Sequence, residues 1–205
     1  MIKIVDTRNK RASTTMQQVM NDFADEVTFN WITYERDENN NVKKICVSDD
    51  VYLEYSDKFY LKHNTLAFSV NIPTDGTYYL IIVTDTCAAL YFPAYTEYRF
   101  FIFGTSKNAR TNVASHGIVA YSSGYIIPYT DNMRSDTWQQ PSSDYANSTY
   151  NLQLAPLTPI SSEDIFTDVY RVVCRKAQPA VGEVLINNTH YVYLLDMMAI
   201  PYTPN

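Results

Sequence analysis

The stretch LAFSVNIPTDGTYYLIIVTDTCAALYF, residues 66–92, decides the fold class. It contains apolar runs of strand length at 66–72, 78–84 and 88–92, and their aromatic and β-branched residues favour strands. The tetrapeptide PTDG at 73–76 is typical of a turn, since each of its residues suits a bend in the backbone. The pattern predicts antiparallel strands joined by short turns.

Short strand signals of the same kind continue on both sides of this stretch. Strands are predicted at 29–34, 43–47, 51–55, 98–103, 117–121, 125–129, 151–154, 168–175, 183–186 and 190–195. Polar turns separate many of them, such as the turn at 37–41, and a polar break is predicted at 104–112. Asn187-Asn188-Thr189 is typical of a hairpin turn. We predict a mainly β protein, an antiparallel β-sandwich or barrel-like domain.

A single stretch, residues 14–27, predicts a short N-terminal amphipathic helix, because its apolar residues recur at steps of three and four. Ser13 or Thr14 is expected to cap its start. Such a helix must bury its apolar stripe against a sheet of its own subunit or against a neighbour. The candidate interface residues on this stripe are Met16, Val19, Met20 and Phe23.

The chain is expected to form one β-rich domain over residues 1–205. An extended N-terminal arm is predicted at 1–12, a long inserted loop at 130–163 and an extended C-terminal tail at 201–205. A two-part arrangement with a break near 104–116 or within the long loop is the alternative. One domain is preferred because neither stretch has the Gly/Ser-rich or charge-run composition of a linker.

Charge and hydropathy exclude several classes of partner. The net charge is −6 and the pI is about 5.0, whereas a protein that coats nucleic acid needs a basic face. The longest apolar runs are too short to span a bilayer, and the N-terminus lacks the apolar region of a secretory signal. We expect no specific nucleic-acid binding and no membrane insertion. Cys46, Cys87 and Cys174 are expected to be reduced core thiols.

The sequence offers few groups for catalysis. His63, His116 and His190 form no metal-ligand spacing, and His63 is expected in a turn. The acidic pairs 49–50 and 163–164 are interpreted as a turn and as a turn or helix start. A nucleophilic pair of Cys87 with His116, or a hydrolase site that also uses His63 or Asp131, stays open as an alternative. We predict a non-enzyme with no catalytic residue, cofactor or metal.

The loop region 129–150 interleaves aromatic side chains with planar polar ones. Its candidate interface residues are Tyr129, Arg134, Trp138 and Tyr145. Tyr, Trp and Arg dominate protein interfaces, so a protein partner is the favoured interpretation. A bound glycan and a solvated loop are the alternatives.

The helix at 14–27, the strands rich in Tyr, Asn and Thr, the long loop and the closing hairpin at 184–194 resemble virion structural proteins of tailed bacteriophages. The resemblance implies a structural component of a viral particle, a ring-forming neck (head–tail connector) or tail protein that holds neighbouring subunits through its arms and loop. Its partners would be other virion proteins and copies of itself, and its location the virion, assembled in the host cytoplasm. A glycan- or receptor-binding module of a baseplate or fibre, or a capsid accessory protein, is the alternative.

Overall fold

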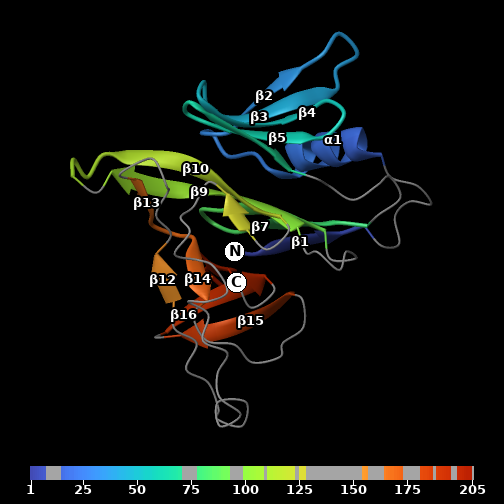
Figure 1. Cartoon of the computed structure of the whole chain (residues 1–205). Coiled ribbons are helices and arrows are strands. Elements are labelled where there is room, and N and C mark those ends of the chain that lie inside the picture. The colour runs from blue at the N-terminus through green and yellow to red at the C-terminus, as the bar shows by residue number, and fades with distance from the viewer. Residues whose placement is uncertain are drawn as a thin grey trace.

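The apolar runs at 78–84 and 88–92 form two strands of a central sheet, whereas the run at 66–72 forms a strand of a second sheet (Figure 1). The computed structural model describes residues 1–7, 15–70, 78–92, 99–108, 110–122, 125–127, 154–156, 164–172, 181–186, 188–194 and 198–204. The central sheet has the strand order β1 (Lys3–Asp6), β7 (Leu80–Val83), β8 (Ala88–Phe92), β9 (Arg99–Asn108), β10 (Ala114–Ser122) and β11 (Tyr125–Ile127). A further strand, β13 (Asp164–Phe166), also pairs with β9.

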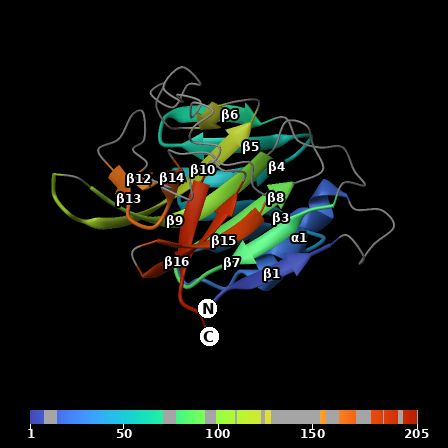
Figure 2. The same cartoon turned by 90° about the horizontal axis from the view of Figure 1, so that it is seen from below.

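Two smaller antiparallel sheets lie on either side of the central sheet, as Figures 1 and 2 show. The N-terminal sheet is a meander of β2 (Thr33–Arg36), β3 (Val42–Ser48), β4 (Val51–Tyr55), β5 (Phe59–His63) and β6 (Leu66–Val70). The C-terminal sheet has the order β12 (Leu154–Pro156), β14 (Tyr170–Val172), β17 (Met198–Tyr202), β16 (Thr189–Leu194) and β15 (Val181–Ile186). The prediction of a mainly β, sandwich-like fold is confirmed, and the described strands close no barrel.

Each face of the central sheet contributes to a separate hydrophobic core. Along β8, Ala88, Leu90 and Phe92 face the first core, which the N-terminal sheet and helix α1 cover. Ala89 and Tyr91 face the second core, which includes residues of the C-terminal sheet. Strands buried on both faces have no polar side to alternate with, which explains the uninterrupted apolar runs of the sequence.

Helix α1 (Met16–Glu26) begins later than expected, because the side chain of Thr15, not Ser13 or Thr14, accepts a hydrogen bond from the Gln18 amide at 3.2 Å. Its apolar stripe packs on the sheets of its own chain. The rings of Phe23 and Phe103 lie 4.9 Å apart, so the stripe reaches the central sheet. Helix, N-terminal sheet and central sheet thus share the first core.

Several boundaries differ from the prediction. Strand β5 was not expected, and β2 begins at Thr33 rather than at residue 29. The predicted break at 104–112 is wrong in its first half, because β9 continues to Asn108 and β10 begins at Ala114. Asp164 lies in β13 rather than in a turn or helix start. Most of the predicted loop at 130–163 lies outside the described residues.

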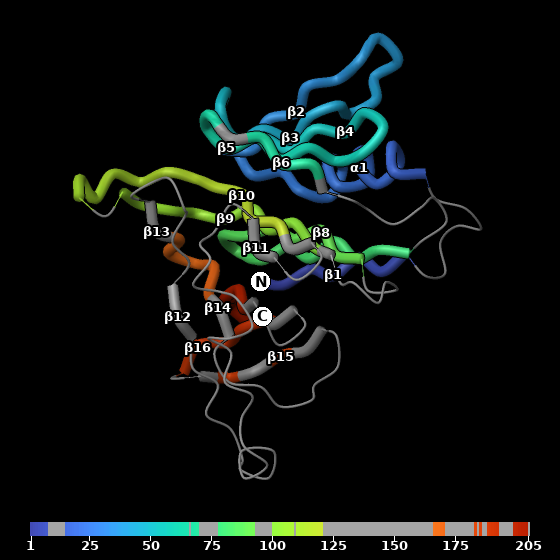
Figure 3. The backbone as a smooth tube through the Cα atoms, in the orientation of Figure 1, coloured from blue at the N-terminus to red at the C-terminus, as the bar shows by residue number. Residues whose placement is uncertain are grey.

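The described parts of both chain ends are strands rather than free arms (Figure 3). Strand β1 pairs with β7 and so satisfies backbone groups at the edge of the central sheet. Pro201 lies in β17 opposite Tyr191, so the ladder continues through residue 201. The carboxylate of Asp85 accepts hydrogen bonds from the Met1 ammonium at 2.5 Å and from the Thr203 amide at 2.7 Å. The predictions of extended arms at 1–12 and 201–205 are therefore corrected for residues 1–7 and 201–202.

Candidate functional site

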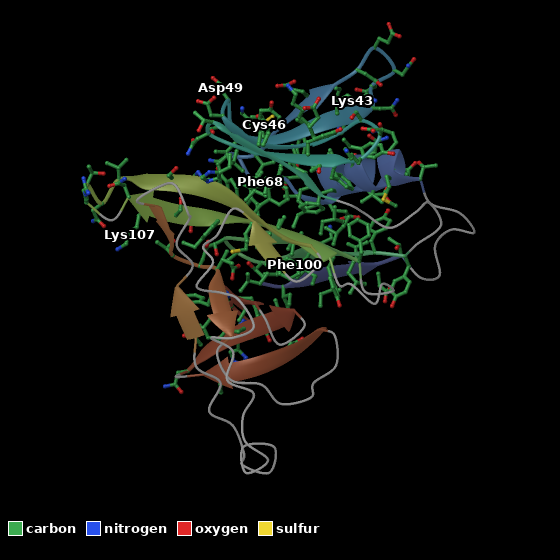
Figure 4. The ribbon with its side chains drawn as sticks, in the orientation of Figure 1. Lys43, Cys46, Asp49, Phe68, Phe100 and Lys107 are labelled. Atoms are coloured by element: carbon green, nitrogen blue, oxygen red, sulfur yellow. The ribbon has the colours of Figure 1, made fainter. Side chains whose placement is uncertain are left out.

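Strands β9 and β10 form a hairpin whose two halves lie in different surroundings. The inner half lies between the two cores, and its Phe100, Phe101, Ile102 and Phe103 are 0% exposed. Pairing between β8 and β9 ends at Phe103, whereas the hairpin continues beyond it. Figure 1 shows this outer half extending past β1 and β7, with β13 alongside it, and Figure 4 labels Lys107 within it.

The described residues of the hairpin tip, 107–108 and 110–113, are held by hydrogen bonds within the tip. The Asn108 side-chain oxygen accepts hydrogen bonds from the amides of Arg110 at 3.0 Å and Thr111 at 2.9 Å. The Asn108 amide donates to the Val113 carbonyl at 2.9 Å, and the Asn112 amide to the Asn108 carbonyl at 2.8 Å. Asn112 has φ 57°, a left-handed conformation that asparagine tolerates better than most residues. The tip is consequently a defined turn.

Most described side chains of the tip are exposed, and two of them carry positive charge. Lys107 and Arg110 are exposed, and Val113 is 63% exposed. No Asp or Glu occurs from 104 to 117, whereas the whole chain has a net charge of −6. The hairpin thus presents two cations and an apolar side chain on a projecting element of an acidic protein.

At the base of this outer half, the buried carboxylate of Asp168 fills a gap in the central sheet. Strands β8 and β13 both pair with β9, and the gap between them lies opposite Thr105. The Asp168 carboxylate accepts hydrogen bonds from the Thr105 amide, at 2.9 and 3.1 Å to its two oxygens, and from the Thr105 hydroxyl at 2.5 Å. The Thr167 amide donates to the Thr105 carbonyl at 3.0 Å. These contacts replace the missing ladder bonds of β9.

Two glycines let the segment that carries Asp168 approach the sheet. Gly104 and Gly117 are direct partners across the hairpin. A Cβ at Gly104 would lie 2.6 Å from Val169 Cγ2 and 2.8 Å from Asp168 Oδ1. A Cβ at Gly117 would lie 2.8 Å from the end of the Phe166 ring. The close approach therefore requires the absence of a side chain at both positions.

The buried titratable groups near this gap are poorly suited to nucleophilic chemistry. Burial raises the pKa of the Asp168 carboxyl, and this effect outweighs the hydrogen bonds from Thr105, which lower it. Burial, and next the Asp168 charge, raises the pKa of the Cys87 thiol well above its usual range. Burial also raises the pKa of the Cys46 thiol to about 11. Cys46 and Cys87 are buried and free, as predicted, whereas Cys174 lies outside the described residues. A protonated thiol is a weak nucleophile.

On the opposite face of the outer half, an aromatic stack covers β10. The Trp31 ring lies between those of Phe29, at 5.1 Å, and His116, at 4.2 Å. Burial lowers the pKa of the His116 imidazole, whereas the Asp168 charge raises it. His116 shares the face of β10 that carries Ile118 in the first core, and Cys87 belongs to the second core. The central sheet separates the two residues, so the structure does not bring the Cys87–His116 pair together.

The structure places the predicted site residues in two groups. Met16, Val19, Met20 and Phe23 are at most 2% exposed and pack within the chain, so they are not available to a neighbour. The residues predicted on the loop, Tyr129, Arg134, Trp138 and Tyr145, lie outside the described residues, as does Asp131. His63 ends β5 and is buried, which corrects its expected place in a turn.

Sequence reasoning missed the hairpin tip because its polar composition resembled a simple connection. The available signal was the charge pattern, since Lys107 and Arg110 stand in a stretch without acids in an otherwise acidic chain. Spacing alone could not show that two flanking strands would carry this stretch beyond the sheet.

No protein-family model matches the chain, and neither does any curated protein or solved structure. Among the described residues, no three His, Cys, Asp or Glu side chains are grouped so that they could hold a metal ion. Within the same part of the chain, no helix has the length and apolar character needed to cross a membrane. The function proposed for the chain therefore rests on its sequence and on the geometry of the described residues.

Proposed function

We propose that the chain is a non-catalytic structural subunit of a tailed-phage particle, a neck or tail component that contacts copies of itself and other virion proteins. The observation that carries this proposal is the projecting hairpin tip with its two exposed cations and Val113, 63% exposed. Enriched charge and an exposed apolar side chain on a projecting element favour a role in contacting a partner.

The chemistry of the described residues supports a structural role over a catalytic one. The Asp168 carboxylate completes the hydrogen bonding of β9, and Cys87 fills the second core. The His116 imidazole stacks on Trp31. Each of these groups therefore has a role in stability. The side chains of Cys87 and Asp168 interact, but both are buried and the pKa of the thiol is raised well above its usual range, so the pair is poorly suited to act as nucleophile and base.

The assignment to a viral particle rests on the resemblance of the sequence to virion structural proteins. The expectation of a ring-shaped oligomer rests on the repeated use of one subunit in such particles. In this proposal the hairpin takes the role that was expected of the terminal arms. Residues 3–6 and 198–202 lie in sheets of the same chain, whereas residues 110–113 lie beyond the last pairing of β9 with β13.

Two measurements test the proposal. Light scattering of the purified chain, with electron microscopy of the same sample, is expected to show a discrete symmetric oligomer, either alone or with a co-expressed virion protein. Gold-labelled antibody against the chain is expected to bind purified particles of the virus that encodes it, at one fixed position. Antibody that marks only the particle-free fraction would contradict the proposal.

A further inference from the structure

A second exposed charged element, the acidic turn Asp49–Asp50, joins β3 and β4. Both aspartates are exposed, and the Asp50 carbonyl accepts a hydrogen bond from the Asn64 amide of the next turn at 2.8 Å. At the other end of the N-terminal sheet, Asp37 has a cation, Lys43, at 3.6 Å. The ion pairs of the described residues include neither Asp49 nor Asp50. The turn is therefore a fixed, exposed site of negative charge.

The acidic turn and the hairpin tip lie at the same end of the molecule. Figure 4 labels Asp49 on the N-terminal sheet and Lys107 on the hairpin, both on the left of the view. The two elements come from different layers, and the hairpin projects farther. A two-fold rotation about an axis near this end would bring the tip and the acidic turn of one molecule toward those of the other.

We infer that the hairpin tip, residues 107–113, binds the acidic turn Asp49–Asp50 of a second copy of this chain, in a reciprocal two-fold contact. The inference rests on the proposed function and names the partner and the surface. Lys107 and Arg110 meet the two carboxylates, and Val113 supplies apolar contact beside them. Because the contact is isologous, each pair of molecules makes it twice.

The physical chemistry of this contact predicts a weak and salt-dependent association. Exposed ion pairs contribute little individually, and a contact made by two hairpin tips is small. Salt screens such charges over about 10 Å at 0.1 M. A second copy is favoured over nucleic acid because a net charge of −6 repels phosphates, whereas the acidic turn complements the tip.

Exchange of the two charge patterns tests the inference. One variant combines Lys107→Glu with Arg110→Glu, and the other combines Asp49→Lys with Asp50→Lys. All four side chains are exposed, so both variants are expected to fold, which circular dichroism checks. Each variant alone is expected to associate at least about tenfold more weakly than the wild type at low salt. An equimolar mixture of the two is expected to recover association, because both contacts of the mixed pair regain opposite charges.

A matched control reverses two cations at the far end of the N-terminal sheet, Arg36→Glu with Lys58→Glu. It changes the net charge as much as the tip variant does, and it is expected to leave association unchanged. Sedimentation velocity at several protein concentrations, in low salt and in about 0.5 M salt, measures all of these samples.

Each outcome separates the inference from the proposed function. If the tip variant assembles as well as the wild type, the hairpin contact is overturned and the structural role stays in place. Wild type that stays monomeric at low salt overturns the contact between copies, and the labelling of particles then tests the role independently. Tip-dependent binding of duplex DNA by a monomeric wild type overturns the inference in favour of nucleic acid. If both variants lose association and their equimolar mixture recovers it, the inference is supported.

Discussion

The inner and outer halves of the β9–β10 hairpin use the same two strands in opposite ways. The inner half is covered on both faces, by the first core and the second core, and its side chains are apolar. In the outer half, β13 pairs with β9 within the sheet, the side chains of Phe166 and Val169 approach one face, and the aromatic stack of Trp31 covers the other. Near the tip, Lys107 and Val113 are exposed.

This difference shows that the surroundings of a strand, more than its own propensity, determine its composition. Phe101 and Thr105 lie in one continuous strand, yet Phe101 packs in a core while Thr105 bonds to Asp168. The inner half supplies stability, and the outer half extends a surface beyond the sheets. Mutations in the two halves should therefore have effects of very different size and kind.

The largest effect is expected from truncating the inner half. Phe101 is 0% exposed, and its ring lies 5.1 Å from that of Phe59 in the N-terminal sheet. Phe101→Ala is expected to lower the free energy of unfolding by about 3–5 kcal/mol, because it leaves a cavity between two sheets. Val113→Ala at the exposed tip is the matched control, with an expected change within about 0.5 kcal/mol. Equal losses in urea denaturation would refute the division of the hairpin into two halves.

A smaller effect is expected where the outer half meets the segment 164–169. Gly104→Ala places a Cβ 2.6 Å from Val169 and 2.8 Å from Asp168, so the segment must move. We expect a loss of about 1–3 kcal/mol in the free energy of unfolding, measured by thermal or urea denaturation. Gly117→Ala, which meets only the end of the Phe166 ring at 2.8 Å, is expected to cost less. A neutral Gly104→Ala would show that the segment does not pack on the sheet as described.

The Asp168 carboxyl gives the outer half a pH-dependent stability. Because burial raises its folded pKa, its contribution to stability is full below the unfolded pKa of about 4 and is lost as the pH rises through the higher folded pKa. The wild type is therefore expected to lose stability relative to Asp168→Asn as the pH rises from about 4 through the folded pKa. Asp168→Ala, which also leaves the Thr105 amide without its acceptor, is expected to cost about 1–3 kcal/mol at low pH and less as the pH rises, because it removes the same carboxyl. A pH-independent difference between wild type and Asp168→Asn would contradict the raised pKa.

The sequence predicted the elements whose signals are local. The turn at 37–41 is such a case, since the Asp37 carboxylate accepts hydrogen bonds from the amides of Asn39 and Asn41 at 2.9 and 2.8 Å. The hairpin of β15 and β16 is another, with Asn188 in the left-handed conformation its turn requires. Both depend on a few neighbouring residues, so their chemistry can be read along the chain.

The sequence did not predict features that depend on distant contacts. Strand β13 is short and has an ordinary composition, and it becomes a strand because β9 offers unpaired backbone groups beyond β8. The role of Asp168 arises from the same gap, 63 residues away from Thr105 along the chain. The β1 pairing with β7 likewise joins segments far apart in sequence, so the segment was interpreted as an arm. The hairpin tip was missed for the same reason, because its position depends on strands that are distant in the sequence.

The smallest effect is expected on the His116 imidazole, which reports on both faces of the outer half. Burial lowers its pKa, and Trp31 stacks on the ring at 4.2 Å, so Trp31→Ala is expected to raise that pKa toward its usual value. Trp31→Phe keeps an aromatic cover and should change the pKa less. Asp168→Asn removes a charge that raises the pKa and is expected to lower it further. Titration by NMR measures each shift, and an unchanged pKa in Trp31→Ala would mean that something other than Trp31 shields His116. Opposite shifts from the two faces would establish that a single residue of β10 senses both coverings of the outer half.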